Sequence, residues 1–124
     1  MENPRGRGAH REHGDPAARL RFYARHGGRA LDVPFFQPAL RHTGRRVPDM
    51  LLVVLPPCPP TDAAGRLPGA AVRTFLAGYL REYEGGPGDD PGVRALWQAV
   101  DRPGGIPLLP LDDLDALPLS SAPR

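Results

Sequence analysis

The sequence contains no lysine, because all 16 of its basic residues are arginine. Without lysine the chain has no residue for a Schiff base and no P-loop lysine for a nucleotide phosphate, so both kinds of chemistry are excluded. The arginines are concentrated at one end: residues 1–50 hold ten of them against five acidic residues, whereas residues 51–124 hold six against nine. We therefore expect any anionic ligand to bind the N-terminal part of the chain.

Cysteine and long apolar segments are also scarce. Cys58 is the only cysteine, which excludes a disulfide within the chain and any site built from several thiolates, and which fits a reducing compartment. The longest apolar run, 50–55, has six residues, against the roughly 20 that a membrane-spanning helix needs, and no secretory apolar stretch follows the N-terminus. The sequence predicts a soluble, cytoplasmic protein without a membrane partner.

Glycine and proline, in contrast, are abundant, with 15 and 17 residues in a chain of 124, while aromatic residues make up only 6%. This share of glycine and proline approaches that of low-complexity segments, and the length is about that of one domain. We expect one modest apolar core, with much of the chain in loops.

Three segments carry the signals of helices. Residues 15–16 are an Asp-Pro pair, in which Asp can cap a helix and Pro suits the first helical position, and the glycines at 27–28 can end that helix. Residues 70–84 place large apolar side chains at helical spacing before the glycines at 85–86. A second Asp-Pro pair at 90–91 opens a shorter helix.

Three other segments resemble strands. Residues 29–33 alternate in polarity and are followed by Pro34 and Pro38, which favours an edge strand or a strand broken by a bulge. Residues 50–55 are uninterrupted apolar residues, as is typical of a strand buried on both faces. Residues 106–111 can add another edge strand. Helices and strands together predict an α/β or α+β fold.

The first predicted helix carries Phe22 and Tyr23, ends near Gly27, four residues after Tyr23, and runs into a strand. This pattern resembles a helix of the GNAT superfamily of N-acetyltransferases. The resemblance covers about residues 1–55, which would form the C-terminal half of such a domain, with a partial GNAT-like mixed sheet and a helix. It implies transfer of an acetyl group from acetyl-CoA, the cosubstrate, to a small-molecule or peptide amine. Tyr23 would then protonate the departing thiolate as a general acid. The alternative is that Tyr23 packs as a half-buried helix residue.

The same helix carries three arginines, Arg19, Arg21 and Arg25. Under the resemblance, Arg19 and Arg25 would contact the phosphates of acetyl-CoA, because guanidinium groups pair well with phosphate. The alternative is that all three form the solvated face of an amphipathic helix.

The phosphate-binding turn of the family has no counterpart here. The Arg-Gly segment 5–8 has no strand before it and no amphipathic helix after it, so it does not form a helix N-terminal phosphate site. We therefore expect the isolated chain to be inactive and the coding sequence to continue upstream of Met1.

The Arg-Gly segment 5–8 is also a single short copy without aromatic residues, so we expect no nucleic-acid partner. His10 and His13 lack a third placed ligand, and we expect no metal site.

We divide the chain into a GNAT-like half domain (1–55), a stiff proline-rich linker (56–69) and a helical appendage with a Leu- and Pro-rich tail (70–124). The alternative to a truncated acetyltransferase is a non-catalytic helical interaction module. Its docking face would be the apolar side of segment 70–84, which would bind a partner or a second copy of the chain to give a homodimer: Val72, Phe75, Leu76, Tyr79 and Tyr83.

Overall fold

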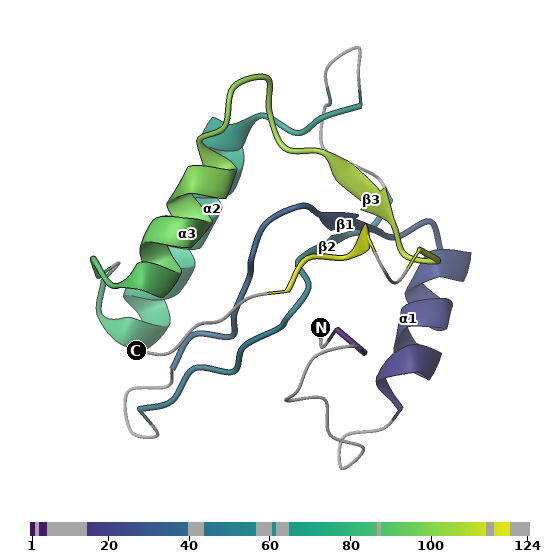
Figure 1. Cartoon of the computed structure of the whole chain (residues 1–124), viewed down its shortest axis with the longest axis horizontal. Coiled ribbons are helices and arrows are strands. Elements are labelled where there is room, and N and C mark those ends of the chain that lie inside the picture. Colours follow the sequence, from purple (N-terminus) through teal and green to yellow (C-terminus); the bar gives the residue numbers. More distant parts are fainter. Residues whose placement is uncertain are drawn as a thin grey trace.

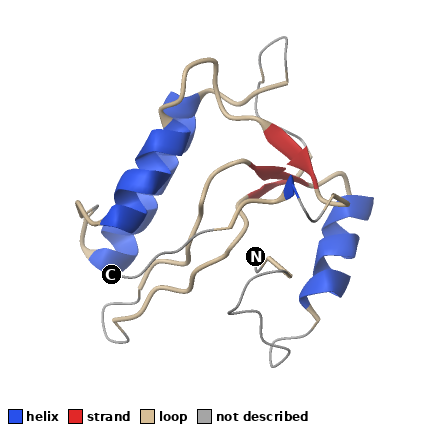
Figure 2. Cartoon of the chain, viewed as in Figure 1, coloured by secondary structure: helices blue, strands red, loops and turns tan. Residues whose placement is uncertain are grey.

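The computed structural model describes residues 1, 3–4, 15–39, 44–56, 61, 65–86, 88–113 and 116–119. Its elements are, in chain order, α1 (Pro16–Arg25), β1 (Arg29–Leu31), β2 (Val53–Val54), α2 (Gly69–Glu84), α3 (Pro91–Val100) and β3 (Leu108–Pro110) (Figures 1 and 2). Helices and a small antiparallel sheet in one chain make an α+β fold, so the predicted fold class is confirmed. The predictions for residues 5–14, among them His10 and His13, and for Cys58 fall outside the described residues.

All three helices begin and end close to where the local signals place them. The Asp15 carboxylate accepts a hydrogen bond from the backbone N–H of Ala17 at 3.0 Å, and Pro16 takes the first position of α1. The Asp90 carboxylate caps α3 by accepting from the N–H of Val93. Helix α2 ends at Gly85, whose φ of 87° lies in the left-handed region that glycine favours.

The sheet has the strand order β2-β1-β3, and both pairs are antiparallel. Strand β1 is therefore central, although residues 29–33 are expected at an edge, because β1 ends at Leu31 before the chain reaches Pro34. Strand β2 lies at an edge and is half-buried, whereas residues 50–55 are expected to be buried on both faces. Strand β3 forms the opposite edge, as expected for residues 106–111.

Apolar side chains pack on both faces of the sheet. Leu31 of β1 points into a cluster with α2 and α3, which also holds Leu76 and Val93. Its neighbour Ala30 points into a second cluster with Leu20 of α1, as the alternation of a strand requires. Figure 1 accordingly shows α1 on one side of the sheet and the α2–α3 pair on the other.

The larger cluster joins segments from both sides of residues 56–69. It combines Phe36 from the N-terminal part of the chain with Leu80 and Leu96 from the C-terminal part, and it includes Leu67 itself. The boundaries at residues 55 and 69 stay a prediction. In the described part of the chain, none of the helices has the length and apolar character needed to cross a membrane.

Candidate functional site

A groove runs between β2 and α2, and we call it the β2–α2 groove. It consists of two adjoining hollows of about 580 and about 340 Å³, which share four lining residues: Leu52, Val53, Leu55 and Phe75. The larger hollow is lined entirely by apolar residues and extends from β2 to Leu67 and to Ala71 of α2. The smaller hollow extends from β2 toward α1 and reaches Tyr79 of α2.

Two large apolar side chains of this groove are exposed. Phe75 is 55% exposed and Leu55 is 42% exposed, and each lines both hollows. Helix α2 forms the groove wall because its apolar residues cover more than one face. Val72, Leu76 and Leu80 are buried in the core, which leaves Phe75 on the flank of the helix. The docking face expected on segment 70–84 is thus divided between core and groove.

An aromatic row continues from Phe75 along α2. The rings of Phe75 and Tyr79 stack with centroids 5.8 Å apart, and Tyr83 meets Tyr79 edge to face at 4.9 Å. Gln37 donates a hydrogen bond from Nε2 to the Tyr79 hydroxyl at 3.2 Å. These contacts fix the orientation of the aromatic wall, because each ring is held by its neighbour.

Polar side chains line only the smaller hollow: Tyr23, Gln37 and Tyr79. Neither hollow is lined by an arginine or by an acidic residue of the described chain. A cationic ligand would lose its hydration in such a groove without gaining an opposite charge, and an anionic ligand would find only the Met1 amino group, which already donates to the Leu51 carbonyl. The groove is therefore suited to an uncharged, largely apolar ligand.

The predicted catalytic and cofactor residues lie on α1. Tyr23 is half-buried, packs against the second cluster and lines the smaller hollow. Arg25 is exposed, and Arg19 has Nε and Nη2 shielded from solvent without a hydrogen-bond partner in the described residues. Neither Arg19 nor Arg25 lines the hollow with Tyr23. The acetyl-CoA site thus stays a prediction, as does the catalytic role of Tyr23.

The N-terminal residues pair with the chain just before β2. The Met1 amino group donates to the carbonyl of Leu51 at 2.7 Å, and the Leu51 N–H donates to the Met1 carbonyl at 2.5 Å. The Asn3 N–H donates to the carbonyl of Asp49 at 2.9 Å. This is a short antiparallel ladder on the outer side of the segment that becomes β2. Periodicity does not predict this ladder, because the first residues of the chain do not alternate in polarity.

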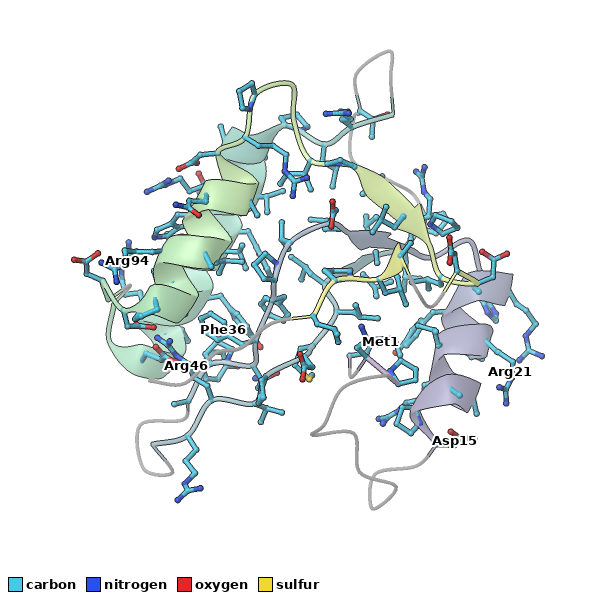
Figure 3. The ribbon with its side chains drawn as sticks, in the orientation of Figure 1. Met1, Asp15, Arg21, Phe36, Arg46 and Arg94 are labelled. Carbon is cyan, nitrogen blue, oxygen red and sulfur yellow. The ribbon has the colours of Figure 1, made fainter. Side chains whose placement is uncertain are left out.

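A second constellation surrounds Arg46, whose side chain is 2% exposed. Its Nε and Nη2 donate to Glu84 at 2.9 and 2.8 Å, and its Nη1 and Nη2 donate to Asp90 at 2.5 and 3.0 Å. The guanidinium also lies 4.4 Å from the ring centroid of Phe36 (Figure 3). Glu84 Oε2 additionally accepts from the N–H of Ala39 at 2.8 Å.

Arg46 therefore serves as a cross-link rather than a ligand site. Both of its carboxylate partners are engaged, one at the end of α2 and one at the start of α3, so the ion cluster ties both helices to the segment before β2. Hydrogen bonding to Glu84 is the largest factor that raises the pKa of Arg46, which keeps the guanidinium charged. Sequence analysis misses this cluster because its members are 38 and 44 residues apart.

The pKa of Asp90 is lowered, first by its hydrogen bond with Arg46 and against the opposing effect of burial. The charge of Asp90 should thus stabilise the fold above the ordinary Asp pKa of 3.8, and this stabilisation should be lost as pH falls through the lower folded pKa.

Asp90→Asn keeps the capping oxygen and removes the charge. Urea unfolding from about pH 6 to about pH 3 should show the wild-type advantage over Asp90→Asn shrinking. A constant difference across this range would contradict a role for the charge.

Comparison of the chain with protein families, with curated proteins and with solved structures found no match.

Proposed function

We propose that this chain is a non-catalytic binding module that takes an extended, apolar segment of another protein into the β2–α2 groove. The observation that carries this proposal is the exposure of Phe75 and Leu55, which both line the two hollows. Large apolar side chains gathered in an open groove favour a binding site, because their contact with water is relieved only by a ligand.

The residues around the groove favour binding over chemistry. Among the described lining residues there is no carboxylate, imidazole, thiol or aliphatic hydroxyl, and the polar side chains are the phenols of Tyr23 and Tyr79 and the amide of Gln37. Acid–base and nucleophilic mechanisms usually combine a group of the missing kinds with a second one within hydrogen-bond reach. Two phenols and one amide suit recognition of backbone or hydroxyl groups.

The dimensions of the groove suit a short extended segment. Its helical wall runs from Ala71 to Tyr79, about two turns of α2, which corresponds to a length of about 12 Å. An extended chain advances about 3.3 Å per residue, so the groove would hold three or four residues. As the single cysteine fits a reducing compartment, we place this interaction in the cytoplasm.

Phe75→Ser should weaken binding of the uncharged apolar dye Nile red to the folded protein by about tenfold, because it removes a large part of the apolar wall. Phe22→Ser is the matched control, since Phe22 is 48% exposed but lies on α1 and lines neither hollow. The measurement is a fluorescence titration of the wild type and both variants, with circular dichroism to confirm that each is folded. Equal losses in the two variants would place the dye elsewhere, and the proposal would be lost.

A further inference from the structure

We propose that the outer face of α1 binds single-stranded nucleic acid, RNA or DNA, through two arginines and a stack of two aromatic rings. The face consists of Arg21, Phe22, Arg25 and His26, all of which are exposed, and we call it the α1 face. None of the four residues lines the β2–α2 groove, so this inference goes beyond the proposed function and does not depend on it.

The packing of α1 determines which side chains form this face. Leu20 is buried, and Tyr23 and Ala24 pack against the same cluster, which turns the opposite side of the helix toward solvent. Arg21 and Arg25 are one helical turn apart on that side. Figure 3 shows Arg21 on the outer side of α1, directed away from the sheet. Both guanidinium groups are therefore open to a ligand in solution.

The positive charge of the α1 face is not neutralised within the described part of the chain. Three other arginines each form a salt bridge with a carboxylate: Arg46, Arg73 and Arg102. Arg21 and Arg25 form none with a described residue, and α1 itself contains no acidic residue. Two like charges one turn apart repel each other, and an anionic ligand that contacts both guanidinium groups would relieve this repulsion.

The aromatic part of the face is already ordered. The His26 ring lies tilted over the Phe22 ring, with the two centroids 4.3 Å apart. His26 Nδ1 lies 2.8 Å from the carbonyl oxygen of Phe22, which can only accept, so Nδ1–H donates and holds the ring. The rings of Phe22 and Tyr23 meet edge to face at 5.6 Å. A nucleobase can extend this stack without first ordering the side chains, which lowers the entropic cost of binding.

The order of these residues matches the repeating unit of a nucleic-acid strand. An arginine is followed by an aromatic ring twice, at residues 21–22 and 25–26, and the two pairs lie one turn, about 6 Å, apart. Each nucleotide likewise joins an anionic phosphate to a flat base. A duplex offers its phosphates but keeps its bases stacked inside, so a single strand alone uses both the arginines and the rings.

The Arg-Gly segment 5–8 predicts no nucleic-acid partner, because it lacks the aromatic residues on which bases stack. Helix α1 lies in the same basic part of the chain and has both residue types on one exposed face. The expectation for segment 5–8 therefore does not extend to α1.

Two other anionic partners fit the α1 face less well. An anionic membrane surface binds helices that bury a wide apolar face, but the apolar side of α1 is packed around Leu20. Phe22 is the one large apolar side chain that α1 exposes. An acidic peptide would pair with the arginines, but it does not supply a flat ring beside each charge, so the aromatic stack would stay unused.

The probes are fluorescein-labelled dodecamers of uridylate and of thymidylate, titrated with the full chain and followed by fluorescence anisotropy. We expect dissociation constants of about 1–100 µM, the usual range for binding without sequence preference. Two phosphate contacts predict that the logarithm of the association constant falls with the logarithm of the salt concentration with a slope of about −1.4. Arg21→Gln should reduce this slope by about 0.7. Phe22→Ser should weaken binding by about tenfold without changing the slope.

A matched pair of substitutions separates the α1 face from the net charge of the protein. Arg21→Gln with Arg25→Gln should weaken binding of the dodecamers by about tenfold. Arg81→Gln with Arg94→Gln removes two exposed arginines from α2 and α3, lowers the net charge equally and should weaken binding by less than about twofold. Circular dichroism confirms that each variant is folded. Equal losses in the two double variants would overturn the inference.

The remaining outcomes separate this inference from the proposed function. Phe75→Ser should weaken binding of the dye and leave binding of the dodecamers unchanged, and Phe22→Ser should do the reverse. Binding of either dodecamer supports the inference, and the tighter of the two identifies the nucleic acid. The inference is wrong if neither binds, if a duplex of the same length binds as tightly, or if polyglutamate or vesicles of phosphatidylcholine and phosphatidylserine bind more tightly. The dye titration decides the proposed function in every one of these cases.

Discussion

Arg46→Met should lower the free energy of unfolding by about 3–5 kcal/mol, because it leaves a buried carboxylate without its counter-charge. The Glu84 side chain is only 1% exposed, so its charge cannot regain water once the guanidinium is gone. The Ala39 N–H would still donate to Glu84, but a neutral backbone donor does not replace the charge of the guanidinium. A loss of this size is comparable with the whole stability of many small domains. Urea unfolding followed by circular dichroism measures it.

Arg73→Met is the matched control for this prediction. Arg73 also pairs with a carboxylate, that of Asp101, and lies over an aromatic ring, that of Trp97 at 4.5 Å, but its side chain is 45% exposed. An exposed ion pair contributes little, so we expect a loss of about 1 kcal/mol or less. Adding Glu84→Gln to Arg46→Met should restore part of the loss by removing the buried charge that Arg46 no longer balances. If the two arginine substitutions lowered the free energy of unfolding equally, or if Glu84→Gln restored none of it, burial of the ion cluster would not be the cause of the loss.

The helices could be predicted from the sequence because their signals are local. An Asp-Pro pair needs only its neighbouring N–H groups to cap a helix, and this is what α1 and α3 show. Gly85 ends α2 for a reason equally confined to its own backbone. Such signals do not depend on how distant segments meet.

The positions of the strands could not be predicted as well. An apolar run such as 50–55 indicates that both faces of a strand can be buried, but it does not indicate which segments pack against them. Here α2 supplies part of the cover and leaves Leu55 and Phe75 exposed, while Met1 covers part of the strand edge. These arrangements depend on register between segments about 50 residues apart, which composition and periodicity do not encode.

The candidate site shows the same division between local and distant information. Helical spacing correctly places Phe75 on the apolar side of α2, yet it does not separate Phe75 from Leu76, which is buried. The choice between them depends on where β1 and α3 pack. The family resemblance points to Tyr23, and the position of this residue at the smaller hollow fits both a catalytic role and a packing role.

Gly69→Ala should destabilise the fold by about 1–3 kcal/mol, the usual range for atoms forced into a packed interior. Gly69 is the first residue of α2, and a Cβ there would overlap the backbone carbonyl oxygen of Val100 at the end of α3. A backbone atom cannot turn away as a flexible side chain can, so α2 and α3 would have to separate at this crossing.

Gly78→Ala makes the same chemical change in the same helix, but its effect on the stability of the fold should have the opposite sign. Gly78 is exposed, and a Cβ there meets nothing within 4 Å, so only the backbone entropy of glycine changes. Alanine in a helix interior is favoured over glycine by roughly 0.5–1 kcal/mol, and Gly78→Ala should stabilise the chain by about that amount. Urea unfolding of both variants beside the wild type measures the two signs directly. If Gly69→Ala also stabilised the protein, the close approach of α2 to the end of α3 would be wrong, and with it the position of the wall of the β2–α2 groove.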